Sequence, residues 1–504
     1  MDPILSPVQV READQYTIRH EPVSSLDLME RASHAFVDKF LTLFASTAPV
    51  RVFCGTGNNG GDGLAIARIL SEKGWPVFVY VTGNPEKATP DFNANLHRLN
   101  QVATWLHQEN EFPEMTRGEI AIDALFGSGL SRPLTGLYAE LTKHLNNSRA
   151  IIVSVDIASG LFADKPVNRT QAIIRPAHTI SFQTAKLAFF QPALHPFTGS
   201  WHVVPIGLST SFLFDCPTPY YSLGKKDLTD VLPQRPLFAH KGTFGRLHLI
   251  AGSRGKMGAA VLASRAALRT GTGLLFVEVP ECGVDIMQVA VPEAMVIENP
   301  GQKFMSTFVG NQEATCVAIG PGIGTGQDVS RAFESFLQNL QPTTRLILDA
   351  DALNLLAQKK TLLTQLPPGT ILTPHPGEFE RLVGSWDDDY SKLEKLRSLC
   401  SHYRLNVVLK GAFSAICDPA GQVVFNTTGN PGMATGGSGD VLLGIVAGWL
   451  AQGMAPADAL RLGVYVHGLA GDRMAQTKGQ ESLLASDLIE GLPAAIQSLK
   501  PVNG

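Results

Sequence analysis

The stretch CGTGNNGGDG, from Cys54 to Gly63, lies between the apolar run VRVF and the helix-like run LAIARIL. Gly55, Gly57 and Gly60 have the spacing of the dinucleotide-binding fingerprint G-x-G-x-x-G. That fingerprint needs a strand before it, a helix after it, and an acidic residue about 20 positions later that holds a ribose hydroxyl. The next apolar run, PVFVYV, ends without a carboxylate. The stretch therefore predicts a strand, a ligand-binding turn and a helix, and it disfavours a hydride-transfer enzyme.

The same stretch contains polar side chains that a turn built only to hold a pyrophosphate does not require. Asn58, Asn59 and Asp62 supply amide and carboxylate groups. Their oxygens are hard donors that suit a bound cation, and the amides suit the oxygens of a ligand. A plain polar turn is the alternative, but this turn falls where doubly wound sheets bind their ligands. We therefore expect a binding site here.

Two further acidic residues follow apolar runs downstream. Asp123 lies in AIDALFGSGLSRPL, and Asp156 lies in VSVDIASG together with Ser159. Because ligands of such sheets bind outside the carboxyl ends of the strands, both acids would face the crevice beside the Gly-rich turn. A single aspartate in such a place is often a helix cap or a turn residue, whereas two of them favour a site. Lys186, in TISFQTAK, is either a positive charge at this site or a solvated surface lysine.

The chain has 504 residues, of which 44% are hydrophobic and 17% are charged, and this predicts two large globular α/β domains. Short apolar runs alternate with helical stretches in both halves, as in folds with a parallel sheet. An amphipathic helix over LDLMERASHAFVDKFLTLF, capped by Ser24 or Ser25, precedes the first strand. The stretch SFLFDCPTPYYSLG loses both periodicities. We expect a domain over 1–210, a linker over 211–224 and a second domain over 225–504.

Charge and cysteine content exclude several classes of protein. The net charge is −4 and no run of Lys or Arg stands out, so we expect no nucleic-acid and no membrane partner. The six cysteines are dispersed without a C-x-x-C pair, which favours buried thiols in a reducing compartment. The first 20 residues lack the apolar region of a signal peptide, and no apolar run reaches membrane-spanning length. We expect a cytoplasmic protein.

The motifs GNNGGDGL, DALFGSGLSRPL and VDIASG together resemble those of NAD(P)H-hydrate epimerases, a family with a Rossmann-like three-layer fold. The resemblance implies that potassium is bound by Asn59, Asp123 and Ser159. It also implies a binding site for the hydrated nicotinamide nucleotide, made by Asn58, Asn59, Gly60, Gly61, Asp62, Gly127, Ser128, Gly129, Leu130, Ser131, Arg132, Pro133 and Asp156. Epimerisation requires nearby charge to manage the electrons of the ring nitrogen, so Asp156 and Lys186 are the candidate catalytic residues.

The second half contains no P-loop, because GSRGKMG places a methionine after the lysine. Its distinctive run is NTTGNPGMATGGSGDVLLGIVAGWL, in which GGSGD, from Gly436 to Asp440, directly precedes an apolar helix. Backbone N–H groups at a helix start bind phosphate, and Asp440 can accept a proton from a substrate hydroxyl. A flexible turn that caps the helix is the alternative. The rigid Asn430-Pro431 upstream makes us favour a phosphoryl-transfer site.

This run, with VVLKGA, LDADALN and LTPHPGEF upstream, resembles the ribokinase-like superfamily and, within it, ADP-dependent NAD(P)H-hydrate dehydratases. The similarity spans nearly all of 225–499. It implies Mg²⁺, ADP as a co-substrate and Asp440 as the catalytic base. It implies nucleotide contacts at Lys410, Gly411, Ala412, Phe413, Ser414 and Gly439, and hydrate contacts at Ala260, Gly322, His375 and Asp440. Taken alone, His375, which lies between two prolines, fits a structural turn residue as well as it fits a hydrate contact.

Together the halves resemble a bifunctional repair enzyme for hydrated nicotinamide nucleotides, which we expect to form a homo-oligomer. The epimerase would interconvert the R and S forms, and the dehydratase would return the S form to NAD(P)H with release of AMP and phosphate. The nearest alternative is a ribokinase-superfamily small-molecule kinase with an accessory N-terminal domain, which would use ATP. A non-catalytic nucleotide-binding protein is a second alternative, and a dehydrogenase is the least favoured.

Overall fold

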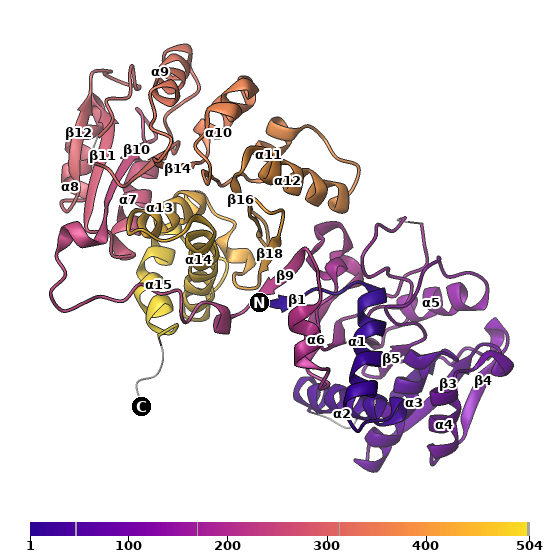
Figure 1. Ribbon diagram of the computed structural model, residues 1–504. Helices are drawn as coiled ribbons and strands as arrows, with labels where there is room; N and C mark the ends of the chain where they lie inside the picture. The colour runs from indigo at the N-terminus through magenta and orange to yellow at the C-terminus, as the bar shows by residue number, and fades with distance from the viewer. Residues whose placement is uncertain (46–47, 169, 312, 501–504) are drawn as a thin grey trace. The chain divides into compact units, whose positions relative to one another are not determined.

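The parallel sheets expected from the alternating sequence pattern are present in the computed structural model, which describes residues 1–45, 48–168, 170–311 and 313–500. The chain divides into two units (Figure 1). The N-terminal unit comprises residues 2–220 with 388–390, and the C-terminal unit comprises Met1, residues 221–387 and the chain from Ser391 onward. The predicted α/β fold class is confirmed for both units.

The N-terminal unit is built from both strands and helices. Its strands are β1 (Asp2–Pro3), β2 (Val50–Cys54), β3 (Val77–Thr82), β4 (Ala103–Leu106), β5 (Ile120–Ala124), β6 (Ile151–Val155), β7 (His178–Phe182) and β8 (Ser200–Val204). Its α-helices are α1 (Pro7–His20), α2 (Ser25–Leu43), α3 (Asn58–Glu72), α4 (Pro90–Arg98), α5 (Leu137–Asn147) and α6 (Thr210–Asp215). Short 3₁₀ helices occupy Pro85–Lys87, Glu109–Glu111, Leu187–Phe190 and Pro192–Phe197.

The sheet of this unit has the order β4-β3-β2-β5-β6-β7-β8, and every pair in it is parallel. The predicted amphipathic helix is confirmed as α2, where the hydroxyl of Ser24 accepts from the N–H of Asp27 as the cap. Helix α2 packs against α3, which lies against β2, β3 and β5, and together they bury Phe36, Phe40 and Ile66. Because all strands point the same way, the polar residues after β2, β5, β6 and β7 meet at one edge of the sheet.

Two helices differ from the sequence-based expectation. Helix α1 was not predicted, although Ser6 and Gln9 form a complete capping box and Pro7 occupies the first turn. Helix α3 begins at Asn58, so the polar stretch expected as a turn forms its first turn instead. A β-carbon at Gly60 would lie 1.7 Å from the carbonyl oxygen of Gly55, which shows how closely this helix start approaches the end of β2.

The C-terminal unit has a larger set of elements. Its strands are β9 (Tyr220–Leu223), β10 (Arg246–Ile250), β11 (Leu274–Pro280), β12 (Met295–Asn299), β13 (Cys316–Ile319), β14 (Arg345–Leu348), β15 (Ile371–Leu372), β16 (Asn406–Leu409), β17 (Ala415–Cys417) and β18 (Val423–Asn426). Its α-helices are α7 (Met257–Arg269), α8 (Val284–Ala290), α9 (Gln327–Gln338), α10 (Asp351–Gln358), α11 (Pro376–Val383), α12 (Asp389–Tyr403), α13 (Ser438–Ala451), α14 (Pro456–Lys478) and α15 (Ala485–Gln497). Its 3₁₀ helices are Lys225–Asp227, Lys241–Phe244, Glu281–Gly283, Lys360–Gln365 and Pro431–Met433.

The sheet of the C-terminal unit runs β9-β18-β17-β16-β15-β14-β13-β10-β11-β12. Strands β10 to β16 pair in parallel, whereas β16-β17 and β17-β18 are antiparallel. The apolar helix predicted after the GGSGD run is α13, which packs against α7 and α14 (Figure 1). A β-carbon at Gly444 would lie 2.1 Å from the carbonyl oxygen of Ala263, so glycine permits the close crossing of α13 and α7.

The stretch expected as a linker, 211–224, contains regular structure. Its first residues belong to α6, whose Phe212 ring lies 5.4 Å from that of Tyr16 on α1, and its last residues form β9. The two prolines, Pro217 and Pro219, fall between these elements. None of the helices in the described residues is long and apolar enough to cross a lipid bilayer. All six cysteines are free thiols, and all but Cys282 are buried.

Candidate active sites

A cavity of about 680 Å³ opens at the carboxyl edge of the N-terminal sheet. Its walls come from α1, from α2, from the start of α3, and from the segments that follow β5, β6 and β7. The structure thus brings together most residues that the sequence predicted for this site, namely Asn58, Asn59, Asp62, Gly127, Ser128, Gly129, Leu130, Ser131, Arg132, Asp156 and Lys186. Gly60 and Gly61 are buried behind it in α3, and Pro133 lies outside its wall.

The centre of this cavity is a buried ion pair. Nζ of Lys186 lies 2.9 Å from Oδ1 of Asp156, and the two side chains are 1% and 10% exposed. Lys186 is therefore a partner of Asp156 and not a solvated surface lysine. Burial alone would raise the pKa of Asp156, but the charge and hydrogen bond of Lys186, with the N–H of Phe182, hold it below its usual value. Asp156 is consequently a carboxylate at neutral pH.

The backbone at Asp156 is strained, since its φ is +64°. A non-glycine residue in this left-handed region costs on the order of 1 kcal/mol or more and persists where its surroundings fix it. The carboxylate is fixed by the N–H of Phe182 and by the hydroxyl of Ser181, each 3.2 Å from Oδ1. This arrangement fixes the carboxylate at the wall of the cavity, beside Lys186.

Of the residues predicted to bind potassium, Asn59 lines this cavity, whereas Asp123 and Ser159 are fully buried and do not line it. Asp123 is fully buried, and its oxygens accept hydrogen bonds from the hydroxyls of Ser154 and Ser159 and from the N–H groups of Leu125 and Ser159. Among the described residues it has no basic partner, so its charge is not compensated. Burial raises the pKa of Asp123, although hydrogen bonds from Ser159 oppose this. An uncompensated buried carboxylate fits a cation.

Asn59 also fits a ligand of such a cation. Its Nδ2 is buried without a hydrogen-bond partner in the described structure, so this donor suits an oxygen of a ligand, whereas Oδ1 is the atom that suits a cation. A β-carbon at Gly127 would lie 3.0 Å from Oδ1 of Asn59, so the segment after β5 passes directly over this amide. The oxygens of Asn59, Asp123 and Ser159 are the hard donors that an alkali cation prefers.

Sequence reasoning missed one wall of the cavity. Arg11, Asp14 and Gln15 of α1 line it together with the predicted residues. Burial, followed by the negative charge of Asp156, raises the pKa of Asp14 to about 6. Burial, then Asp156 and Asp14, raise the pKa of Asp62 well above its usual range. The capping box at Ser6 was the signal that predicts this helix, but nothing in the sequence directs it to the cavity.

In the C-terminal unit the start of α13 approaches two charged side chains. Nζ of Lys410 lies 2.9 Å from Oδ1 of Asp349, which follows β14. A β-carbon at Gly439 would lie 3.4 Å from this Nζ and 3.9 Å from Oδ2 of Asp349. Asp440 occupies the first turn of α13. Gly437, the residue just before this helix, has a left-handed backbone conformation with a φ of +91°. Free N–H groups, an ammonium and two carboxylates therefore meet at one helix start.

The environment of Asp440 suits a proton acceptor. Burial, followed by the negative charge of Asp349, raises the pKa of Asp440 to about 6, while Lys410 acts in the opposite direction. A group with such a pKa is deprotonated at neutral pH and is still basic enough to take a proton. Asp349 thus raises the pKa of Asp440 and forms an ion pair with Lys410.

The other residues predicted for this unit lie in several places. His375 is half-exposed and caps α11, where its Nδ1 accepts from the N–H of Gly377. Gly322, with a φ of +68°, faces Lys256 and Ala259 on the N-terminal end of α7. Ala260 is fully buried in the core, so its neighbour Ala259 is the more accessible position. The nucleotide-contact candidates Lys410, Gly411, Ala412, Phe413 and Ser414 form the turn between β16 and β17.

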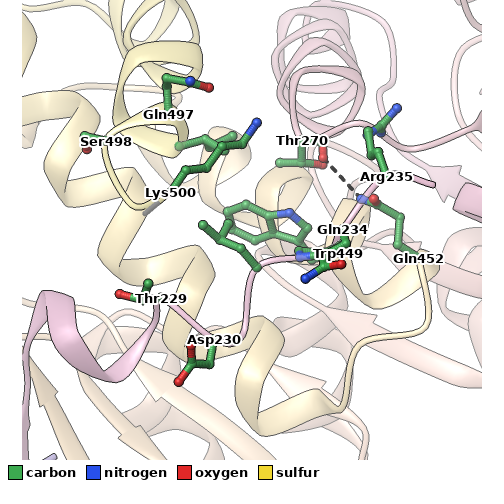
Figure 2. A pocket seen from close by; sticks show the side chains of 13 residues that line it. Thr229, Asp230, Gln234, Arg235, Thr270, Trp449, Gln452, Gln497, Ser498 and Lys500 are labelled. Carbon is green, nitrogen blue, oxygen red and sulfur yellow. Dashed lines mark hydrogen bonds between the residues drawn. The ribbon is translucent and has the colours of Figure 1, made fainter. Parts of the chain in front are cut away.

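A cavity of about 850 Å³ in the C-terminal unit is separate from these residues. Figure 2 shows the indole of Trp449 among the side chains that line it, with Gln452 donating to the carbonyl of Thr270. None of the residues predicted for the dehydratase site lines it. This cavity is therefore distinct from the charged groups at the start of α13.

The fold and the two sites define a two-unit α/β enzyme. Residues 25–188 match the family described as YjeF-related protein N-terminus, and residues 247–494 match the family described as NAD(P)H-hydrate dehydratase. Proteins named bifunctional NAD(P)H-hydrate repair enzyme are similar over nearly the whole chain. That of Thermofilum pendens is 32% identical, over 97% of this chain and 94% of its own, and that of Escherichia coli is 33% identical, over 92% and 88%. The chain belongs to the family of bifunctional NAD(P)H-hydrate repair enzymes.

A solved structure supports the fold of the C-terminal unit. A ribokinase-like superfamily protein from Enterococcus faecalis is 30% identical, with a TM-score of 0.50, over 56% of this chain and 98% of its own. The predicted ribokinase-like fold is thereby confirmed. The alternative of a small-molecule kinase is not favoured, because the relatives that match both halves are named as hydrate repair enzymes.

Proposed function

We propose that this chain repairs hydrated nicotinamide nucleotides in two reactions. The N-terminal unit interconverts the R and S forms of NADH hydrate and NADPH hydrate. The C-terminal unit dehydrates the S form with ADP and releases AMP and phosphate. The observation that supports this best is that a relative named bifunctional NAD(P)H-hydrate repair enzyme matches 97% of the chain. A buried acidic and basic pair in each unit agrees with it. We assign residues 1–210 to the epimerase, 211–224 to the connection and 225–504 to the dehydratase.

In the epimerase, the hydrate would bind in the cavity between α1, α3 and the segment from Gly127 to Pro133. Asp156 and Lys186 would face the hydrated carbon, where the ionised carboxylate stabilises positive charge that develops on the ring. Asn59, Asp123 and Ser159 would hold K⁺. When bound, that ion would neutralise the buried charge of Asp123. It would also hold the start of α3, which contains Asn59, beside the segment that contains Ser159.

In the dehydratase, the side chain of Asp440 would accept the proton of the hydrate's hydroxyl as its oxygen attacks the β-phosphorus of ADP. AMP is released, and the hydroxyl becomes a phosphate ester, a much better leaving group than water. The N–H groups at the start of α13 and the ammonium of Lys410 would stabilise the charge on the phosphoryl oxygens. Loss of phosphate from the hydrated carbon and of a proton from its neighbour then restores the ring double bond.

Mg²⁺ is the second ion of the proposal, and it would neutralise nucleotide phosphates. No group of three or more His, Cys, Asp or Glu side chains in the described residues forms a ready metal site. This fits an ion that is bound mainly by the phosphates and only one or two carboxylates. Asp349 and Asp440 are the carboxylates nearest to the glycine-rich helix start, so they are the candidates.

The cellular setting is also part of the proposal. Six free thiols, five of them buried, fit the reducing cytoplasm, where we place the protein. Its partners would be NADH hydrate, NADPH hydrate and ADP, without nucleic acid or membrane. A homo-oligomeric state stays a prediction, which light scattering after size-exclusion chromatography checks.

The two reactions can be tested separately with chromatographically resolved R and S forms of NADH hydrate. Without nucleotide, the protein should convert either pure form into the same mixture. With ADP and Mg²⁺, the S form should yield NADH and AMP in equal amounts. ATP use with accumulation of a stable phosphorylated product would instead support the kinase, and no conversion of either form would refute the proposal.

A further inference from the structure

Helix α1 supplies part of the wall of the epimerase cavity from outside the segment that the family match covers. The match begins at residue 25, whereas α1 spans Pro7–His20. Arg11, Asp14 and Gln15 lie one turn or less apart on this helix, and all three line the cavity. This arrangement places the carboxyl group of Asp14 in the same cavity as Asp156 and Lys186.

Asp14 is the only one of these three with a carboxyl group, and its surroundings are unusual. It is half-buried, and within the described part of the chain no hydrogen bond or ion pair reaches its carboxyl group. The charged groups that line the cavity with it come from several elements and comprise Arg11, Asp62, Asp91, Arg132, Asp156 and Lys186. Burial, with the negative charge of Asp156, raises the pKa of Asp14 to about 6.

We infer that Asp14 is a further catalytic residue of the epimerase and is the acid that protonates the departing hydroxyl of the hydrate. This inference rests on the proposed epimerase function. Two carboxyl groups in one cavity with pKa values shifted in opposite directions are the usual arrangement for acid and base roles. Asp156 is held ionised by Lys186, whereas Asp14, with its pKa raised to about 6, keeps its proton to a higher pH than an ordinary carboxyl group.

The reaction then balances as follows. The carboxyl group of Asp14 gives its proton to the hydroxyl oxygen while the bond from the hydrated carbon to that oxygen breaks. The lone pair of the ring nitrogen forms a double bond to the carbon, which leaves an iminium ion and water. Water adds to the opposite face, its electron pair forms the new carbon–oxygen bond, and the double-bond pair returns to nitrogen. The surplus proton passes to Asp156, and exchange with solvent restores both carboxyl groups.

Asp62 is the competing donor, because it lines the same cavity. Burial, followed by the negative charges of Asp156 and Asp14, raises the pKa of Asp62 well above its usual range. A carboxyl group held so strongly in its neutral form is a weaker proton donor than one whose pKa is near the working pH. Asp14, whose pKa is near the working pH, is therefore the stronger candidate.

The test measures interconversion of R and S NADH hydrate by the full-length protein, without nucleotide, as a function of pH. The variants are Asp14→Asn, the conservative Asp14→Glu, and Glu12→Gln as the matched control on an exposed position of the same helix. Asp14→Asn should lower kcat by about 10² to 10⁴-fold with KM changed only a few-fold. It should also remove the decline of kcat/KM above about pH 6, and Asp14→Glu should restore part of the activity and the decline.

Several outcomes would overturn the assignment. Asp14→Asn with the kcat and pH profile of the wild type would show that the residue is not the acid. Loss of the alkaline decline in Asp62→Asn but not in Asp14→Asn would assign the role to Asp62. ADP-dependent dehydration of the S form should be unchanged in Asp14→Asn, which shows that the protein is folded. If the wild type itself does not interconvert the two forms, the proposed epimerase function fails, which is distinct from failure of this inference.

Discussion

The ammonium of Lys186 lies 2.9 Å from the carboxylate of Asp156, and both groups are almost completely buried. The pair places a fixed negative charge at the cavity wall without leaving an uncompensated ion in the interior. Removing one member of such a pair is costly, because the remaining charge stays desolvated.

We expect Lys186→Met to impair both epimerisation and stability. Stability should fall by about 3 to 5 kcal/mol at pH 8. Without the ammonium, burial would raise the pKa of Asp156 above its unfolded value, so the loss should shrink as the pH falls and the carboxylate takes up a proton. Thermal unfolding at pH 5 and pH 8 measures this. The double variant Lys186→Met with Asp156→Asn should recover most of the stability, and equal losses at both pH values would contradict the account.

We expect Gly60→Ala to disrupt the first turn of α3. Its β-carbon would lie 1.7 Å from the carbonyl oxygen of Gly55, which is backbone and cannot move aside easily. Overpacking of this kind lowers the free energy of unfolding by about 1 to 3 kcal/mol or more. The resulting displacement of the first turn of α3 should also raise KM for the hydrate. Gly57→Ala is the matched control, because nothing lies within 4 Å of its β-carbon. Equal melting temperatures for the two variants would argue against this packing.

Asp440→Asn should abolish dehydration while leaving epimerisation intact. Loss of a general base typically lowers the rate by about 10² to 10⁴-fold. The same variant should be more stable than the wild type at pH 7, by up to about 3 kcal/mol. The pKa of Asp440 is raised from 3.8 to about 6 in the fold, so the cost of its ionised form builds up between these two pH values and is fully present at pH 7. Asp285→Asn, at an exposed position of α8, is the control. ADP-dependent NADH formation by Asp440→Asn at the wild-type rate would exclude the base role.

Potassium should stabilise the N-terminal unit through Asp123. Replacing Na⁺ by K⁺ is expected to raise the melting temperature of the wild type and to accelerate epimerisation. Asp123→Asn should lose both responses, because it removes the charge that the ion neutralises. Ser154→Ala is the matched control, since Ser154 donates to Asp123 but is not a proposed ligand. A K⁺ response that persists in Asp123→Asn would place the ion elsewhere.

Much of this architecture follows from local patterns in the sequence. The alternation of apolar runs and helices predicted both parallel sheets. The aspartates that follow apolar runs, Asp123 and Asp156, do meet at one sheet edge, because parallel strands align their carboxyl ends. The GGSGD run does begin an apolar helix beside Lys410.

Other features depend on contacts that no local pattern reveals. Lys186 is a surface lysine or a buried partner depending only on the fold around it. Helix α1 has clear capping signals, but its position over the cavity, which brings Asp14 to the site, depends on long-range packing. No local pattern predicts the role of Asp349, because its ion pair with Lys410 joins segments far apart in the chain.

The most direct test of the account is recovery of NADH absorbance from a mixture of R and S NADH hydrate, with Mg²⁺ and K⁺, in the presence of ADP, ATP or no nucleotide. The wild type with ADP should convert the whole mixture faster than spontaneous epimerisation allows. Asp156→Asn should convert rapidly only the S fraction, and Asp440→Asn should convert none. Failure of the wild type to restore NADH with either nucleotide would contradict the account.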